Sequence, residues 1–393
     1  MRILKGNIIT PYEIIKNGMI VIDNGIIEDI FRDGSTPVSG DITDIGNGYI
    51  LPGLIDIHNH GGAGYDYMDA TEEAFNAISV YLASHGVTTS LATTVTAPLK
   101  SILNCLKNFR EMSGSVTGCR LLGIHLEGPY LSVRNKGAQP EDYLLTPEKD
   151  GYGFVLEYAD IIKLITVSPE LPGMRRMIRD LKRAGIVISG GHDDAVELEI
   201  FPAIDAGMTH TTHIYCAMST LQKRNTSRYC GLCEIAMSDD RLTTEMIADN
   251  HHIPATFAKI IYKLKGADKV CIVSDCLRAG GLENQGGIFY LGQAGEKGHP
   301  IIIEDGIAML PDKSRFAGSV QALDRMIKNC VQDSGIPLPD AVRMASLTPA
   351  SVIGIHKETG SIAIGKRADI CIMDNDFNVT ETILEGRTIY QRR

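Results

Sequence analysis

The N-terminal part of the chain has an alternating pattern of apolar and polar residues. In the segment MIVIDNGIIEDIF, Asn24-Gly25 separates two apolar runs, and an Asn-Gly pair in this setting is typical of a β-hairpin. Asp33-Gly34 and Asn47-Gly48 predict two further turns. Residues 1–50 are therefore predicted to form short β-strands.

From about residue 51 the pattern changes to short apolar segments that end in polar residues, each followed by a helical stretch. Eight such segments occur along the chain: YILPGLIDIHNH, GVTTSLATTV, LLGIHLEGP, IIKLITVSPE, GIVISGGHDD, MTHTTHIY, LTTEMIAD and KVCIVSD. Strands that alternate with helices in this way predict an α/β fold with a closed parallel (β/α)8 barrel. A chain of 393 residues with 44% hydrophobic residues is long enough for this barrel and a smaller domain.

The C-terminal part returns to the alternating pattern. AVRMASLTPASVIGI predicts a final helix, and GSIAIGKRADICIMDNDFNVTETILEGRTIY predicts strands like those at the start. We expect residues 1–50 and 347–393 to pair into a small β-sandwich domain, while residues 51–346 form the barrel that carries the active site. The segment GIFYLGQAGEKGHPIIIEDGIAML predicts a β insertion after the last barrel strand.

Composition limits the location and the partners. The opening MRILKGNIITPYEI has no basic segment leading into an apolar one, and the nine cysteines are scattered, so we expect a cytoplasmic protein with reduced thiols. No apolar run approaches the roughly 18 residues that a membrane helix needs. The formal net charge of −10 gives no general attraction for nucleic acid, so an anionic ligand must be held by a local group of cations.

Residues of the metal-ligand type lie at the ends of five predicted barrel strands. His58 and His60 are two residues apart on one strand, so both imidazoles point to the same face. The other strand ends carry Glu127, His192, His213 and Asp275. Barrel active sites form at this end, and buried His, Glu and Asp are costly without partners. The pattern therefore favours a metal centre over a set of core polar groups.

Longer motifs surround these residues: PGLIDIHNHG, TTSLATT, LLGIHLEGPYLS, KGAQP, VSPE, GGHDDA, THIYCAMS, EMIADNHHIP, SDCLRAGGL, FAGS and GSIAIGKRADICIMD. Through them the chain resembles, over nearly its full length, the N-acetylglucosamine-6-phosphate deacetylases of the amidohydrolase superfamily. The resemblance implies that all six residues form the metal site, with Glu127 in a bridging position. Both histidines of the first pair are present, which favours two divalent ions, with Zn or Fe as candidates.

The implied reaction is the hydrolysis of N-acetyl-D-glucosamine 6-phosphate to D-glucosamine 6-phosphate and acetate, in amino-sugar catabolism. A bound metal lowers the pKa of a water molecule and polarises the acetamide carbonyl. Asp275 takes the proton of this water and returns one to the leaving amine. Asp275 is therefore expected to be the catalytic residue as well as a metal ligand.

The resemblance also implies substrate contacts from Gln139, Ala217, Arg224 and His252. Arg224 is the best match to an arginine that reaches the sugar phosphate across a dimer interface in relatives, so we expect a homodimer; Arg228 is the alternative after a register shift. Gln139 is as well explained as a solvated loop residue. Cys216 replaces the expected Asn, and the Pro-Gly turn after it is missing, which leaves the sugar epimer open.

Other functions remain open at this level. One is deacetylation of N-acetylgalactosamine 6-phosphate, and another is hydrolysis of a different N-acyl or cyclic amide, which would not need Arg224 or His252. A non-catalytic scaffold is disfavoured because all six metal-type residues are present. Cys230 and Cys233 have no second pair at a zinc-site spacing, so packing is the expected role, and supporting roles are expected for His125 and His210.

Overall fold

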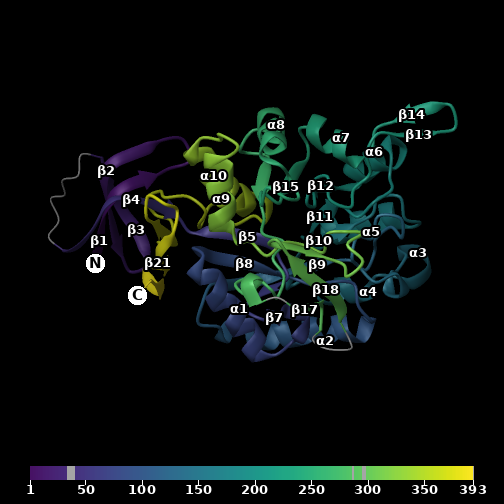
Figure 1. Ribbon diagram of the computed structural model, residues 1–393, viewed down its shortest axis with the longest axis horizontal. Coiled ribbons are helices and arrows are strands. Elements are labelled where there is room, and N and C mark those ends of the chain that lie inside the picture. The colour runs from purple at the N-terminus through teal and green to yellow at the C-terminus, as the bar shows by residue number, and fades with distance from the viewer. Residues whose placement is uncertain (33–39, 286, 294–297, 393) are drawn as a thin grey trace.

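The computed structural model describes residues 1–32, 40–285, 287–293 and 298–392. Within them the chain forms a parallel barrel and, at one end of the molecule, a second sheet that contains both chain ends (Figure 1). We call this second sheet the terminal sheet. The predicted Asp33-Gly34 turn lies outside the described residues.

Eight parallel strands of the described part form the barrel, and each falls on one of the predicted apolar segments. They are hydrogen-bonded in chain order: β5 (Leu54–Asn59), β8 (Val87–Thr93), β9 (Arg120–Glu127), β10 (Ile162–Val167), β11 (Val187–Gly190), β12 (Met208–Thr211), β15 (Thr243–Met246) and β16 (Val270–Ile272). These strands are almost wholly buried, because helices cover the outside and side chains fill the interior. The α/β barrel prediction is confirmed.

The barrel closes where its first and last strands meet. The Asp275 N–H donates to the His58 carbonyl at 2.8 Å, and Asn59 and Cys276 form a parallel bridge. The Ser319 N–H then donates to the Asp275 carbonyl at 2.8 Å. This closing seam therefore fixes the backbones of His58 and Asp275 against each other.

Helices cover the barrel: α1 (Glu72–Ser84), α2 (Leu99–Met112), α3 (Pro147–Asp150), α4 (Gly153–Glu157), α5 (Met174–Arg183), α6 (Glu197–Ala206), α7 (Leu232–Ser238), α8 (Ala255–Lys265), α9 (Leu323–Gln332), α10 (Leu338–Met344) and α11 (Leu347–Val352). The predicted last helix is in fact split into α10 and α11, because Pro349 has no N–H to continue the bonding to the preceding turn. None of the described helices is long and apolar enough to cross a membrane.

The terminal sheet joins the two ends of the chain. Its order is β22 (Arg387–Gln391), β21 (Val379–Leu384), β20 (Ile370–Met373), β4 (Asp41–Pro52), β1 (Arg2–Ile9), β2 (Ile14–Asp23) and β3 (Ile26–Phe31). Leu51 of β4 pairs with Cys371 of β20. Leu4, Ile22 and Ile372 belong to a buried cluster that is separate from the barrel core. We propose on this ground a terminal domain with boundaries near residues 50 and 347.

The two predicted turns within the described residues have different outcomes. Asn24 and Gly25 take φ values of 48° and 80° and connect β2 to β3, as the hairpin prediction requires. The prediction of a turn at Asn47-Gly48 is wrong, because these residues lie within β4. There the pairing with β1 passes from Asp44 to Tyr49, and the intervening residues form a bulge in which Gly46 has a φ of 63°.

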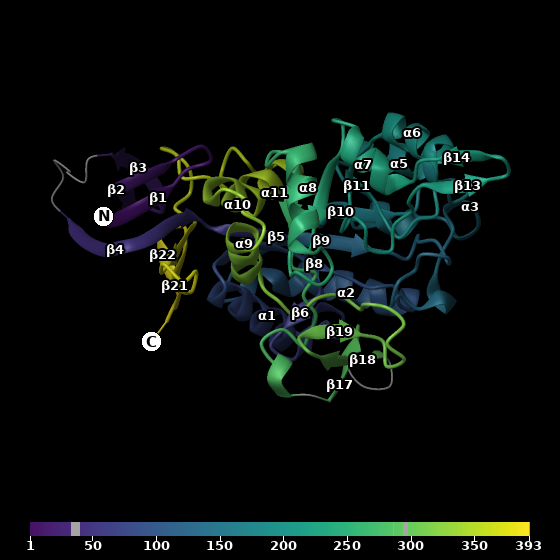
Figure 2. The same cartoon turned by 45° about the horizontal axis from the view of Figure 1, so that its top comes forward.

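The predicted insertion forms a small antiparallel sheet of β17 (Ile288–Leu291), β18 (His299–Glu304) and β19 (Ile307–Met309), which projects beside the barrel (Figure 2). Buried Arg278 holds it in place by donating to the carbonyls of Tyr290, at 2.6 Å, and Gly292. Shorter elements fill the remaining connections: β6 (Gly61–Gly62), β7 (Tyr65–Asp66), β13 (Gln222–Arg224), β14 (Ser227–Tyr229), η1 (Tyr67–Asp69), η2 (Ser113–Ser115), η3 (Glu141–Tyr143) and η4 (Glu283–Gln285).

Candidate functional site

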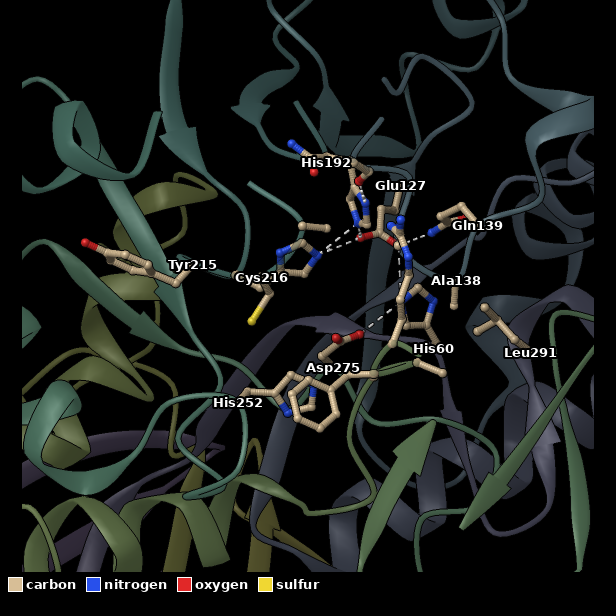
Figure 3. Close-up of a pocket in the computed structure, with 18 of the residues that line it drawn as sticks. His60, Glu127, Ala138, Gln139, His192, Tyr215, Cys216, His252, Asp275 and Leu291 are labelled. Atoms are coloured by element: carbon tan, nitrogen blue, oxygen red, sulfur yellow. Dashed lines mark hydrogen bonds and ion pairs between the residues drawn. The ribbon is translucent and has the colours of Figure 1, made fainter. Parts of the chain in front are cut away.

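The six residues predicted to form a metal site lie together at the carboxyl ends of the barrel strands. Figure 3 shows Glu127 in the middle of the group, with His192, His60 and Gln139 around it. Glu127 Oε1 lies 3.1 Å from His192 Nε2 and 3.2 Å from His213 Nε2. Its other oxygen, Oε2, lies 3.4 Å from His60 Nε2.

Asp275 completes the group on the side of the first histidine pair. Its Oδ1 lies 3.1 Å from His60 Nε2 and 3.5 Å from His58 Nε2. The six side chains therefore divide into two sets that share Glu127. One set contains His58, His60 and Asp275, and the other contains His192 and His213.

Backbone turns aim three of these side chains at the centre. His192, His213 and Asp275 have φ values of 49°, 25° and 45°, a left-handed region that side chains other than glycine rarely adopt. Each such residue costs on the order of 1–3 kcal/mol and persists only when its surroundings hold it. The fold therefore accepts strain at the strand ends in order to converge the donor atoms.

Hydrogen bonds fix which imidazole nitrogen faces the centre. The Nδ1–H of His192 donates to the Asn135 carbonyl at 3.0 Å, and that of His58 donates to Glu245 Oε2 at 2.8 Å. The Nε2 atoms then carry lone pairs and approach their neighbours, at 3.3 Å for His58 and His60 and 3.1 Å for His192 and His213. Two lone pairs repel unless a proton or a cation lies between them, so the donor set fits metal ions.

The electrostatics of the group favour positive charge. Burial lowers the pKa of His58, but Glu245, Asp275 and Glu127 outweigh it and bring this pKa to about 9. Burial raises the pKa of Glu127, but the neighbouring histidines, His192 foremost, hold it well below its usual range. The carboxylates therefore stay ionised and draw cations, and metal ions binding here would displace protons from the imidazoles.

Glu245 was not identified from the sequence, although the structure places it directly behind the site. This buried residue of β15 accepts from His58 Nδ1 and, at 3.0 Å, from the His213 N–H. His210 Nε2 lies 3.4 Å from its other oxygen. The available signal was an acidic residue inside the apolar strand LTTEMIAD, since a buried carboxylate needs partners.

The neighbouring histidines behave as expected for supporting residues. His125 is buried, with Nε2 2.7 Å from Thr166 Oγ1 and Nδ1 3.2 Å from the Ile57 carbonyl. His210 Nδ1 lies 2.6 Å from Thr243 Oγ1. Cys233 is buried in the barrel core, which agrees with a packing role.

Above the six residues lies a cavity of about 510 Å³, a size typical of small-molecule sites. Three of the predicted substrate contacts, Gln139, Ala217 and His252, line it. Gln139 is buried rather than solvated: its Nε2 donates to Glu127 Oε2 at 2.7 Å, and its Oε1 accepts the Thr96 N–H at 2.7 Å. Gln139 therefore supports Glu127, with one amide N–H left for a ligand.

His252 provides the cavity with a cationic group. Its Nδ1 lies 2.7 Å from Asp249 Oδ2, so the opposite ring nitrogen, Nε2, remains available. Burial lowers the pKa of His252, but the hydrogen bond and the charge of Asp249 outweigh it and leave the pKa raised above 6.5. Cys216 also lines the cavity, on the opposite side of Glu127 from Gln139 in the view of Figure 3.

Arg224 does not line the cavity of the chain to which it belongs. It belongs to the β13–β14 hairpin, which both Figure 1 and Figure 2 place at the far end of the molecule from the terminal sheet. Its guanidinium donates to Glu199 Oε1 at 3.1 Å and to the Asp194 carbonyl at 2.8 Å. Arg228, the alternative, is exposed on β14. Within one chain, neither arginine is among the described residues that line the cavity.

Comparison with known proteins gives consistent results. The amidohydrolase family matches residues 49–389. The N-acetylglucosamine-6-phosphate deacetylase of Bacillus subtilis (strain 168) is 33% identical over 98% of this chain and 95% of its own length. The N-acetylgalactosamine-6-phosphate deacetylase of Escherichia coli O157:H7 is 30% identical over 89% of this chain and 90% of its own length.

A solved structure of similar fold contains a bound sugar phosphate. It is a mutant N-acetyl-D-glucosamine-6-phosphate deacetylase from Mycobacterium smegmatis in complex with N-acetyl-D-glucosamine-6-phosphate. The TM-score is 0.90, with 28% sequence identity and coverage of 99% of both chains. The similarity therefore extends over the terminal sheet as well as the barrel.

Glu245→Gln is expected to weaken metal binding by about 10- to 100-fold, because the amide is a weaker acceptor for the His58 Nδ1–H and no longer orients that ring. Metal content after dialysis, measured by elemental analysis, tests this expectation. Glu381→Gln, which alters a buried carboxylate of the terminal sheet, is the matched control. Equal metal retention by both variants would contradict the role of Glu245.

Proposed function

The chain belongs to the amidohydrolase family and, within it, to the N-acetylglucosamine-6-phosphate deacetylases, and from this we propose its substrate and mechanism. It is a hydrolase of linear amides that converts N-acetyl-D-glucosamine 6-phosphate to D-glucosamine 6-phosphate and acetate. The observation that carries the proposal is the convergence of four imidazoles on Glu127 and Asp275 at the base of a cavity that also contains His252.

Two divalent metal ions, Zn or Fe, fit the residues present. His58, His60 and Asp275 would hold one ion, His192 and His213 the other, and Glu127 would bridge them. Bound ions would activate a water molecule and polarise the acetamide carbonyl. Neutral imidazoles and carboxylates are donors that both metals accept, and hydrogen bonds to Glu245 and Asn135 already orient two of the imidazoles.

Asp275 moves the proton. Burial raises the pKa of Asp275, but the charges of His58 and His60 outweigh it and lower this pKa, so the group is a carboxylate at neutral pH. It can take a proton from the attacking water and then deliver one to the amine nitrogen, which is a poor leaving group until protonated. Gln139 keeps Glu127 in place and has one N–H left for a sugar hydroxyl or the acetamide oxygen.

Phosphate recognition is proposed to involve two subunits of a homodimer. His252 would contact the phosphate from within the chain, and Arg224 would contact it from the second subunit. The face around the β13–β14 hairpin supports this, since Leu198, Phe201 and Leu221 are exposed there by 64%, 41% and 51%. Such apolar groups beside a hairpin that does not reach its own cavity suit a subunit interface.

A second candidate substrate and a cellular location are also proposed. Deacetylation of N-acetylgalactosamine 6-phosphate is the second candidate function, because Cys216 replaces an expected Asn in the cavity wall and a relative of that name is 30% identical. We propose the cytoplasm as the location, since a phosphate dianion does not cross a lipid bilayer unaided.

Metal-loaded protein is expected to release acetate from N-acetylglucosamine 6-phosphate and to act weakly on the unphosphorylated sugar. Asp275→Asn should lower kcat by about 10²- to 10⁴-fold, because it removes the group that accepts and returns the proton. Asp41→Asn, which alters an exposed carboxylate of the terminal sheet, is the control. Release from N-acetylgalactosamine 6-phosphate alone would reassign the epimer, and release from neither sugar phosphate would refute the proposal.

Subunit mixing tests the origin of the phosphate-binding arginine. Arg224→Met and Asp275→Asn are each expected to be impaired as homodimers. In a mixed dimer, the subunit with intact Asp275 would receive an intact Arg224 from its partner, so activity should rise above the sum of the two parents. Unchanged activity after verified subunit exchange would place Arg224 outside the partner's site.

The pH dependence of KM tests His252. In Asp249→Asn the carboxylate that raises the pKa of His252 is lost while the burial that lowers it remains, so this pKa should fall. A larger share of His252 would then be neutral near neutral pH, and KM for the phosphorylated sugar should rise several-fold. As the pH falls, His252 becomes protonated in both proteins and the difference should shrink; a difference independent of pH would contradict this role.

A further inference from the structure

Arg315 occupies a distinctive position in the cavity wall. Among the described residues that line the cavity, it is the only lysine or arginine. The formal net charge of the chain is −10, so a dianionic ligand depends on such a local cation. The predictions from the sequence did not include Arg315, because it lies on the turn after the insertion rather than at a barrel strand end.

The backbone that carries Arg315 is held by pairing on both sides. Met309 and Phe316 form an antiparallel bridge, and the Leu310 N–H donates to the Arg315 carbonyl at 3.0 Å. A few residues later, the Ser319 N–H donates to the carbonyl of Asp275 at 2.8 Å. Arg315 therefore projects from a tight hairpin turn that is tied to the backbone of the catalytic aspartate.

The guanidinium of Arg315 has no carboxylate within 4.0 Å in the described part of the chain. The carboxylate of the neighbouring Asp312 accepts hydrogen bonds from the Ser314 N–H, at 3.0 Å, and from the Ser314 hydroxyl, at 2.6 Å. The acidic groups that line the cavity have other partners: Glu127 contacts His192, and Asp275 contacts His60. Asp249, next to the cavity residue His252, bonds to that histidine. The donors of Arg315 are therefore free for a ligand.

Two other residues of the cavity wall indicate which part of the ligand Arg315 meets. The ring of Phe316, its direct neighbour in the chain, packs on His252 with ring centroids 4.7 Å apart, and His252 is the residue proposed to contact the phosphate. In the cavity wall, Cys216 stands where the sequence resemblance expects an asparagine amide. Burial raises the pKa of the Cys216 thiol well above its usual value, so it stays neutral and is only a weak donor.

From these observations we infer that Arg315 binds the 6-phosphate of the substrate from within the same chain and replaces donor capacity that Cys216 lacks. The inference rests on the proposed function. Guanidinium groups bind phosphate oxygens through paired, charge-assisted hydrogen bonds. Arg315 would thus determine specificity for the phosphorylated sugar without taking part in the proton transfer.

The test compares kcat and KM for N-acetylglucosamine 6-phosphate and for N-acetylglucosamine in the metal-loaded wild type and in Arg315→Met. KM for the phosphorylated sugar should rise about 10- to 100-fold, with kcat little changed. The kcat/KM for the unphosphorylated sugar should stay the same, and Arg315→Lys should recover part of the loss. Lys313→Met removes a cation of the same hairpin that pairs with Glu304 outside the cavity, and should have no effect.

Unchanged KM in Arg315→Met, or equal losses on both sugars, would overturn this inference while leaving the proposed function in place. Calorimetric binding of N-acetylglucosamine 6-phosphate, measured in parallel, separates the two proposals. Binding by the wild type without turnover, weakened in Arg315→Met, would refute the deacetylase function and support the role of Arg315. Neither binding nor turnover by the wild type would overturn both.

Discussion

Everything at the base of the cavity depends on one electrostatic constraint, which is that three carboxylates, those of Glu127, Asp275 and Glu245, are buried close together. Such groups are tolerated only where positive charge or hydrogen-bond donors compensate them. The imidazoles provide this compensation, and they need cations in turn because their Nε2 lone pairs face one another. The left-handed backbone at His192, His213 and Asp275 and the seam between the first and last strands follow from the need to bring these groups into contact.

The sequence predicted those parts of the molecule that depend on local pattern. Short apolar runs with polar ends located all eight barrel strands, and polar residues at those ends located the group of six residues centred on Glu127, since parallel strands present their carboxyl ends at one edge. Features that depend on tertiary contacts were missed or wrong. The role of Glu245 depends on its hydrogen bond to the His58 ring, which lies two strands away in the barrel. Asn47-Gly48 lies in a bulge of β4 instead of forming a turn. Pro349 divides a continuous apolar pattern into two helices.

Chemistry and recognition come from different parts of the chain. The groups that converge on Glu127 lie at or just after the carboxyl ends of barrel strands, whose positions are fixed by hydrogen bonding on both sides. The groups expected to meet the phosphate stand on connections: His252 follows β15, Arg224 is on a hairpin, and Arg315 is on the turn after the insertion. Connections of this kind change in sequence and length without disturbing the sheet, which lets the same catalytic arrangement serve different ligands.

The terminal sheet has a consequence for how the chain is made. Strands β1 to β4 are synthesised before the barrel, yet β4 finds its partner β20 only after the barrel strands have been made. Until then, the edge of β4 and apolar residues such as Leu4 and Ile22 remain without their final cover. Pairings between distant segments form slowly, so the nascent chain carries an unpaired strand edge, open to aggregation and to chaperones, throughout the synthesis of the barrel.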